Sequence, residues 1–285
     1  MSPTLAIREL TVRLGAVRVL HRIRLEIAPG EVHGLVGESG AGKSMIARAV
    51  LGLLPAAARV EGGSIRFEGR ELNGMAPAEH RQLMGREISL VPQDPMTALN
   101  PGHTIGAQLG GFLRRRGGLG RAAAGRRALE LLERVRIREA SRVLGLYPHE
   151  LSGGMRQRVL IAMAFALQPR LVVADEPTTA LDVTVQREIL RLFRELQHDH
   201  GCAVLFVTHD LGVVAKLCDR VSVIFAGTIW EQETTALLLE RPLHPYTRAL
   251  LAAMPRWDRP GDTLVPVPAE LTRQLRLDAE AYDAA

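Results

Sequence analysis

The chain has few cysteines and few aromatic residues. Its 285 residues include 2 cysteines, Cys202 and Cys218, and aromatic side chains make up 4% of the sequence. Neither cysteine has a partner at metal-ligand spacing, so the sequence argues against a cysteine metal site and predicts two reduced thiols rather than a disulfide. The scarcity of aromatic residues argues against a stacking platform for single-stranded nucleic acid.

Long hydrophobic runs are also missing. The longest apolar run covers residues 159–167, about half of the ~20 residues that a membrane-spanning helix needs. Glu9 interrupts the N-terminus before the apolar core of a signal peptide can form. We therefore expect a cytosolic protein that reaches a membrane only through a partner. The sequence contains no internal repeat and no low-complexity segment.

Lysine is nearly absent, although the net charge is positive. Lys43 and Lys216 are the only lysines, and the formal net charge is +5. A basic balance suits nucleic acid or an anionic membrane, but the arginines are spread along the chain, which is typical of a solvated surface. The one dense run, Arg114-Arg115-Arg116, stands beside two glycines and predicts an exposed loop. His198 and His200, at a charged helix end, are also expected to be exposed.

Apolar strands that alternate with helices dominate the remaining pattern. Residues 22–27 alternate charged and apolar side chains, which predicts a half-buried strand. Further strands are predicted at residues 32–36, 65–67, 88–91, 171–174, 203–207 and 221–226. Such strands between helices imply a mainly parallel sheet covered on both faces. We expect an inserted helical block at about residues 100–165 and, in the Pro-rich tail, a helix at residues 245–254.

A phosphate-binding loop follows the strand predicted at residues 32–36 and precedes a helix expected to end near residue 54. It reads Gly37-Glu38-Ser39-Gly40-Ala41-Gly42-Lys43-Ser44 and matches G-x-x-x-x-G-K-[ST]. The glycines allow backbone N–H groups to cradle a β-phosphate, Lys43 reaches the β- and γ-oxygens, and Ser44 ligates Mg²⁺. The flanking strand and helix argue against a chance glycine-rich turn.

Polar side chains follow several predicted strands, where open α/β sheets bind ligands. Asp175 and Glu176 follow residues 171–174. Asp175 would hold Mg²⁺ through water, and Glu176 would polarise the water that attacks the γ-phosphate. Gln93 could bind Mg²⁺ and that water, and His209 could donate to the γ-phosphate. Taken singly, Gln93 and His209 are more often ordinary loop residues.

A second anion-binding element lies at Leu151-Ser152-Gly153-Gly154-Met155. A serine and two glycines directly before a helical run leave backbone N–H groups open to an anion, and a helix N-terminus is already a phosphate site. By itself the stretch is a weak signal, because Ser-Gly-Gly also occurs in ordinary loops. Two phosphate-binding elements in one domain require an explanation.

Taken together, these stretches resemble the nucleotide-binding subunits of ABC transporters. The elements found in the family's order are the phosphate loop, Gln93, the signature at residues 151–155, residues 171–176, the Ala180-Leu181-Asp182 segment and His209. The resemblance spans residues 5–255. It implies an α/β P-loop NTPase with an antiparallel β subdomain and an inserted α-helical subdomain. The domain boundaries expected from it are 1–255 for the nucleotide-binding domain and 256–285 for a C-terminal extension.

Three stretches resemble the peptide/nickel importer branch of this family. They are residues 93–101, 177–186 and 243–247, and Met155 is also usual in that branch. The resemblance implies an ATPase, with ATP and Mg²⁺, that energises uptake of peptides or of nickel and other metal complexes. Peptides, nickel, metallophores, opines and glutathione all stay open as cargo, because this subunit does not touch the cargo.

The resemblance also implies an assembly. Two such subunits, identical or different, pair head to tail, so that Ser152, Gly153 and Gly154 serve ATP held by the partner's phosphate loop, with Asp182 also at the nucleotide site. Closure drives two transmembrane permease subunits, which the Gln93 loop faces, and an extracytoplasmic solute-binding protein takes part indirectly. We expect the subunit at the cytoplasmic face of the plasma membrane, without nucleic acid.

The sequence departs from the family pattern at two places. Leu14 occupies the position where the family usually stacks adenine on an aromatic residue, so ATP affinity or base selectivity is expected to be weaker. No cysteine follows Cys218. In the family that this chain resembles, many peptide-importer subunits carry a C-terminal cysteine cluster for an iron–sulfur centre. We predict no such cluster in this chain.

The motifs alone also allow a non-transport ATPase of the same superfamily that acts on DNA or ribosomes. DNA-repair members need a long coiled coil between the phosphate loop and the signature, but the gap here is short and contains glycine pairs. Translation factors usually join two nucleotide domains in one chain, and one is present here. An exporter subunit is a third alternative, and the branch-specific stretches argue against it.

Overall fold

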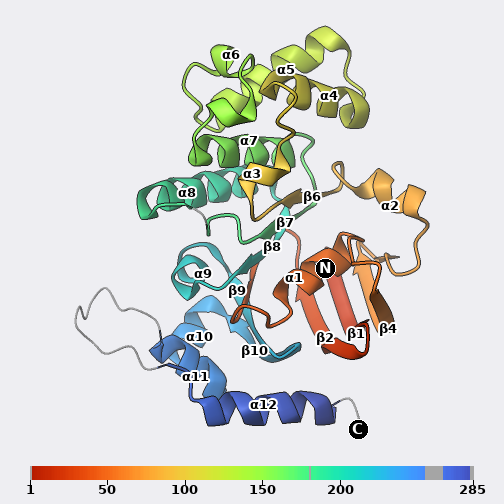
Figure 1. The fold of residues 1–285 in the computed structure, drawn as a ribbon, viewed down its shortest axis with the longest axis vertical. Helices are drawn as coiled ribbons and strands as arrows, with labels where there is room; N and C mark the ends of the chain where they lie inside the picture. Colours follow the sequence, from red (N-terminus) through yellow and green to blue (C-terminus); the bar gives the residue numbers. More distant parts are fainter. Residues whose placement is uncertain (1, 180, 254–265, 283–285) are drawn as a thin grey trace. The chain divides into compact units, whose positions relative to one another are not determined.

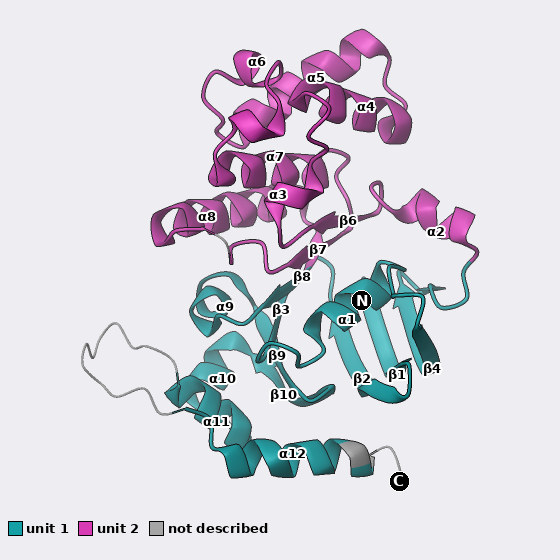
Figure 2. Cartoon of the chain, in the orientation of Figure 1, with its two compact units in different colours: residues 1–75, 205–285 teal, residues 76–204 magenta. Residues whose placement is uncertain are grey.

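The computed structural model describes residues 2–179, 181–253 and 266–282, and the chain divides into two compact units (Figure 2). Unit 1 comprises residues 1–75 and 205–285, and unit 2 comprises residues 76–204. Ala180, Met254 and the domain boundary expected at residue 255 lie outside the described residues. None of the helices in the described ranges has the length and apolar character needed to cross a membrane.

Unit 1 contains an antiparallel sheet built from N-terminal residues (Figure 1). Its strand order is β2-β1-β4-β5, and neighbouring strands run antiparallel. The strands are β1 Leu5–Leu14, β2 Val17–Ile27, β4 Ala58–Phe67 and β5 Arg70–Glu71. Residues 22–27 of β2 alternate between exposed and buried, which confirms the half-buried strand predicted there.

The second sheet of unit 1 contains the strand that leads into the phosphate loop. Its order is β10-β9-β3-β8, with β3 and β9 parallel and β9 and β10 antiparallel. The strands are β3 Val32–Val36, β8 Ala203–Thr208, β9 Arg220–Phe225 and β10 Thr228–Thr234. The first two residues of β8 belong to unit 2. Every residue of β3 is buried, as expected for a strand covered on both faces.

The helices of unit 1 begin with the one that follows the phosphate loop. They are α1 Lys43–Val50, α9 Leu211–Leu217, α10 Thr235–Glu240, α11 Pro245–Ala252 and α12 Ala269–Tyr282. Helix α1 ends at Val50, before the predicted end near residue 54, because Gly52 adopts the left-handed conformation (φ 64°) and Pro55 follows.

Unit 2 contains two parallel strands and the predicted helical block. Strand β6 Ile88–Val91 pairs in parallel with β7 Leu171–Asp175, and both predicted strands are confirmed. The helices are α2 Pro77–Leu83, α3 Pro95–Ala98, α4 Ile105–Gly117, α5 Arg121–Arg134, α6 Ala140–Val143, the 3₁₀ turn Pro148–Glu150, α7 Gly153–Phe165 and α8 Val183–His200. Short helices therefore separate β6 from the signature.

Two local predictions were wrong. Arg114-Arg115-Arg116 forms the last turn of α4, not a loop: Gly118 closes the helix in the left-handed conformation (φ 68°), and cations are favoured near a helix C-terminus. His198 is exposed as predicted, but His200 is half-buried, and its ring stacks on Phe165 with centroids 5.9 Å apart. Burial lowers the pKa of His200.

The structure generates a prediction about pH at the start of α11. The Nδ1 atom of His244 accepts a hydrogen bond from the Tyr246 backbone N–H (3.2 Å), and the His244 ring stacks on Trp230. Burial lowers the pKa of His244; Glu231 opposes this shift and Arg248 adds to it. The unfolded chain therefore binds the proton more tightly. The stability that neutral His244 contributes is present above about pH 6.5 and is lost as the pH falls through the lower folded-state pKa.

Urea unfolding at about pH 7 and about pH 5 measures this contribution. His244→Asn keeps a capping side chain that does not titrate in this range. We expect a smaller loss of unfolding free energy on acidification in His244→Asn than in the wild type. An equal loss in the two proteins would contradict the assignment.

Candidate functional site

The phosphate loop connects the end of β3 to the start of α1 in unit 1, and its glycines are required by close contacts. A Cβ atom on Gly37 would lie 2.1 Å from the carbonyl oxygen of Ile224, a backbone atom of β9. Gly42 adopts φ 108°, where a side chain would be strained, and a Cβ there would also meet Leu20 at 2.9 Å. The loop therefore packs tightly against β9 at Gly37 and against β2 at Gly42, and only glycine fits at these positions.

Lys43 is the central cation of the loop. It is buried, with 4% of its surface exposed, and its Nζ atom donates to the carbonyl oxygens of Gly37 (2.8 Å) and Glu38 (2.9 Å). Hydrogen bonds from a charged donor are stronger than neutral ones, so the ammonium group ties the two ends of the loop together. Ser44 follows in the first turn of α1 and is half-buried.

The middle of the loop is fixed by backbone hydrogen bonds. The N–H of Ala41 donates to Glu38 (3.2 Å), and its carbonyl oxygen accepts from the N–H of Gly227 (2.9 Å). Ser39 and Gly40 are exposed at the tip. Helix α1 begins without a side-chain cap, and the N–H groups of Met45 and Ile46 both donate to the carbonyl oxygen of Gly42 (3.1 Å each). The positive end of the helix dipole at this N-terminus favours an anion.

In unit 2, the structure brings Gln93 and Glu176 together. Strand β7 is buried as far as Ala174, and Asp175 and Glu176 follow half-buried. The Oε2 atom of Glu176 accepts hydrogen bonds from Thr179 Oγ1 (3.0 Å) and from Gln93 Nε2 (3.4 Å). Glu176 also has φ 45°, a left-handed backbone that is uncommon outside glycine and that recurs at functional sites.

The signature forms the N-terminus of α7 in unit 2, as predicted. Ser152 is the N-cap, and its Oγ atom accepts from the N–H of Met155 (3.3 Å). Gly153 is exposed, and a Cβ atom there would meet nothing within 4 Å. On Gly154, a Cβ atom would lie 2.8 Å from Val185, so this glycine has a packing role in α7 against α8. The glycine at residue 153 has no such role in the described fold.

The remaining candidate residues lie at helix starts or strand ends. Asp182 is exposed and caps α8, because its Oδ1 accepts from the backbone N–H groups of Thr184 (3.1 Å) and Val185 (3.0 Å). His209 is exposed directly after β8, in unit 1. Unit 1 thus holds the phosphate loop and His209, and unit 2 holds Gln93, Asp175, Glu176, the signature and Asp182.

Three further residues were not predicted. Thr179 binds the Glu176 carboxylate, and Asp94 and Asp210 cap α3 and α9 by accepting backbone N–H groups at 2.7 Å. The two caps were detectable, since an aspartate directly before a helical run is a common N-cap. The sequence carries no comparable signal for Thr179.

Leu14 lies at the end of β1, where the first hairpin turns. It is half-buried and pairs with Val17, which is 64% exposed. No aromatic side chain stands at residues 14–17, so this hairpin offers aliphatic rather than aromatic surface.

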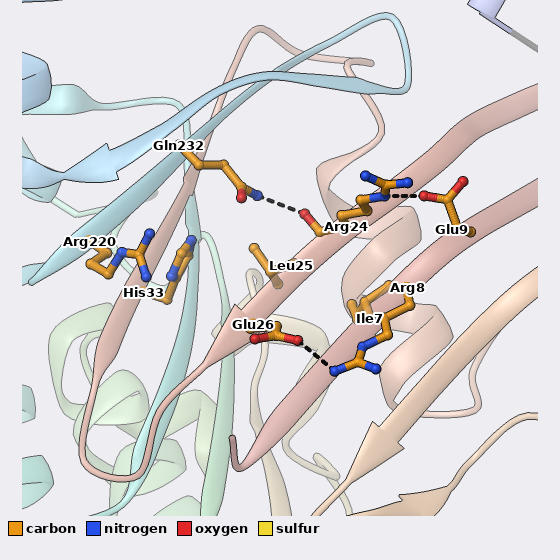
Figure 3. A pocket seen from close by; sticks show the side chains of 9 residues that line it. All are labelled: Ile7, Arg8, Glu9, Arg24, Leu25, Glu26, His33, Arg220 and Gln232. Atoms are coloured by element: carbon orange, nitrogen blue, oxygen red, sulfur yellow. Dashed lines mark hydrogen bonds and ion pairs between the residues drawn. The ribbon is translucent and has the colours of Figure 1, made fainter. Parts of the chain in front are cut away.

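Unit 1 also contains a separate cavity of about 520 Å³, shown in Figure 3. His33, the second residue of β3, and Arg220, the first residue of β9, line it at the opposite end of β3 from the phosphate loop. Its other arginines are paired locally: Arg8 with Glu26 (3.1 Å), and Arg24 with Glu9. This cavity is therefore distinct from the phosphate loop, and much of its charge is neutralised by its own lining.

Comparison with protein-family models gives two matches. Residues 20–179 match the model described as ABC transporter, and residues 230–279 match the one described as oligopeptide/dipeptide transporter, C-terminal region. The first covers the phosphate loop, the signature and the strand that ends in Asp175, and the second covers α10, α11 and most of α12.

Curated relatives and solved structures agree with these matches. A probable peptide ABC transporter ATP-binding protein of Sinorhizobium fredii is 50% identical over 84% of this chain and 71% of its own. The oligopeptide transport ATP-binding protein OppD of Haemophilus influenzae is 44% identical over 97% and 87%. A dimeric structure of a bacterial ABC transporter cassette is 27% identical over 81% of this chain and 98% of that chain, with a TM-score of 0.72.

The geometry of the phosphate loop yields a prediction for Gly37→Ala. The new Cβ atom would overlap the carbonyl oxygen of Ile224, so the loop must move away from β9 and its N–H groups no longer converge. We expect ATP affinity, measured by isothermal titration, to fall at least about tenfold, since a shift of 1 Å can have large effects on positioned groups. Gly62→Ala, whose Cβ would meet nothing within 4 Å, is the control. Wild-type affinity in Gly37→Ala would contradict the proposed loop geometry.

Proposed function

The chain belongs to the ABC transporter family, and from this we propose that it is the ATP-hydrolysing subunit of an importer that takes up peptides. The observation that carries the peptide assignment is the match of residues 230–279 to the oligopeptide/dipeptide transporter C-terminal region. Relatives named as peptide and oligopeptide transport ATP-binding proteins support it. Nickel or metal-complex uptake belongs to the same branch and is the second cargo to test.

In this proposal, unit 1 binds the phosphates of ATP. The N–H groups of residues 37–44 surround the β-phosphate, and Lys43 turns its ammonium from the carbonyl oxygens of Gly37 and Glu38 to the β- and γ-phosphate oxygens. The absence of room for a Cβ atom on Gly37 supports this role, because close backbone approach is what a phosphate cradle requires. His209 donates a hydrogen bond to the γ-phosphate.

The candidate ligands for Mg²⁺ also fit that ion chemically. Ser44 offers a hydroxyl, Asp175 a carboxylate and Gln93 an amide oxygen, all hard oxygen donors of the kind that Mg²⁺ prefers. When bound, Mg²⁺ would neutralise charge on the β- and γ-phosphates. The protein's own part is to present these oxygens at the ends of α1, β6 and β7.

Glu176 is the proposed general base. The hydrogen bonds from Thr179 and Gln93 fix the orientation of its carboxylate, and its backbone adopts the left-handed conformation directly after β7. A carboxylate held in this way can accept a proton from the water that attacks the γ-phosphate.

The signature is proposed to act on ATP held by a second subunit. Gly153 is exposed at the N-terminus of a helix of 13 residues, where a Cβ atom would meet nothing within 4 Å and where the helix dipole favours an anion. Ser152 and Asp182 are exposed as well. Pairing of two subunits head to tail would use these groups and would make each ATP site depend on both chains.

The proposed partners are two transmembrane permease subunits at the cytoplasmic face of the membrane, with a solute-binding protein acting indirectly. The segment after Gln93 supports a docking role, since Met96 is 62% exposed on the short helix α3. The alternative of a non-transport ATPase acting on DNA has less support, because helices α2–α6 between the phosphate loop and the signature are short and form no coiled coil within the described residues.

Glu176→Gln tests the catalytic assignment. The amide cannot accept the proton from water, and the phosphate loop is unchanged. We therefore expect ATP affinity close to wild type and a kcat lower by about 10²- to 10⁴-fold, measured by phosphate release in the assembled transporter. Glu130→Gln on α5, an exposed residue that pairs with Arg127, is the control and should hydrolyse ATP at the wild-type rate. Unimpaired hydrolysis by Glu176→Gln would overturn the assignment.

Gly153→Ala tests the signature. A Cβ atom at this position would meet nothing within 4 Å, and alanine favours a helix more than glycine does. The free energy of unfolding should therefore stay the same or rise by up to about 1 kcal/mol. ATP binding to the single subunit should also be unchanged, but ATPase activity of the assembled transporter should fall about tenfold or more.

The control for Gly153→Ala is Gly125→Ala, which places the same methyl group in open space on α5. It should leave the ATPase activity unchanged. Full ATPase activity in Gly153→Ala, or full activity of a monomer, would contradict the shared site.

A further inference from the structure

Residues 243–247 form a turn whose shape is fixed by one carboxylate. The Glu231 side chain on β10 accepts hydrogen bonds from the backbone N–H groups of Leu243 (2.8 Å) and His244 (3.0 Å). Pro245 occupies the first turn of α11, and His244 caps that helix. These interactions fix the backbone directly before Tyr246, which follows Pro245 and is buried in unit 1.

Tyr246, on α11, is completely buried against the end of β9, close to the phosphate loop. Its relative exposure is 0%, and its ring lies 4.8 Å, centroid to centroid, from Phe225, the last residue of β9. The neighbouring residue Ile224 is the one whose carbonyl oxygen leaves no room for a side chain on Gly37. The guanidinium group of Arg276, on α12, also lies over the Phe225 ring, 5.6 Å from its centroid.

The hydroxyl of Tyr246 is buried and completes no hydrogen bond with any residue in the described ranges. Buried polar groups are almost always paired, so an unpaired hydroxyl calls for an explanation. Burial raises the pKa of Tyr246, the Glu38 carboxylate raises it further, and the Glu38 backbone opposes these effects. The phenol is therefore a neutral O–H group beside Glu38, a residue of the phosphate loop.

The loop itself shows when this hydroxyl would be needed. In the structure, the ammonium of Lys43 holds the carbonyl oxygens of Gly37 and Glu38. If Lys43 turns toward the phosphates of ATP, as in the proposed function, the first part of the loop loses two charge-assisted hydrogen bonds at the moment when its N–H groups must stay in position.

We propose that Tyr246 is a positioning residue for the phosphate loop, whose hydroxyl completes a hydrogen bond with Glu38 when ATP draws Lys43 away. The C-terminal region, through α11, thereby contributes to ATP affinity. This inference rests on the proposed function in two respects, that ATP is the ligand of the loop and that Lys43 turns to its phosphates.

Tyr246→Phe tests the proposal, because it removes the hydroxyl and keeps the ring against Phe225. The nucleotide-free protein should unfold at the same temperature or higher, since a buried unpaired hydroxyl is lost. The Kd and KM for ATP should rise about threefold to tenfold, the effect of one hydrogen bond, while kcat at saturating ATP stays within about twofold of the wild type.

Tyr147→Phe is the matched control. Tyr147 is 40% exposed in unit 2, so loss of its hydroxyl should change neither stability nor ATP affinity. A Tyr246→Phe protein that binds ATP like the wild type would overturn the proposal. If the variant is also less stable, Tyr246 has a purely structural role. Failure of the wild type to bind ATP would instead overturn the proposed function, so the two failures are distinguishable.

Discussion

The ammonium group of Lys43, bound to the carbonyl oxygens of Gly37 and Glu38, is the interaction on which the proposed mechanism depends. Both acceptors are backbone carbonyl oxygens, and a buried charge is tolerated only when it is hydrogen-bonded. The carbonyl of Ile224 behind Gly37 keeps the loop from relaxing away. In the proposed function, binding of phosphates therefore needs no new loop conformation, and Lys43 exchanges the two carbonyl acceptors for phosphate oxygens.

The carboxylate proposed as the general base is positioned by different interactions. Thr179 and Gln93, two uncharged donors, both donate hydrogen bonds to Oε2 of Glu176. The left-handed backbone at Glu176 is unfavourable for a residue with a side chain, and it persists because Pro177 and Thr178 are buried directly after it.

The sequence predicted the parts of this protein that follow simple periodicity and known spacing. The buried strands β3, β6 and β7 and the cap at Ser152 all lie where residue patterns placed them. Strands β1 and β10 and helix α12 were not predicted. The bulged pairing of β1, with residues 7–13 shifted in register, interrupts its alternation. The position of Tyr246 depends on a carboxylate from another strand, Glu231, which no local pattern reveals.

The surroundings of Gly153 and Gly154 support the proposed shared site in addition to the sequence motif. Gly154 is required by Val185, so its lack of a side chain is explained within the subunit. Gly153 stands beside it in open space, where alanine would favour the helix. A residue that lowers helix propensity without any internal reason is expected where something external approaches the backbone. In the proposed function, the ligand that approaches the N-terminus of α7 is the phosphate of ATP held by the second subunit, an anion that a helix N-terminus favours.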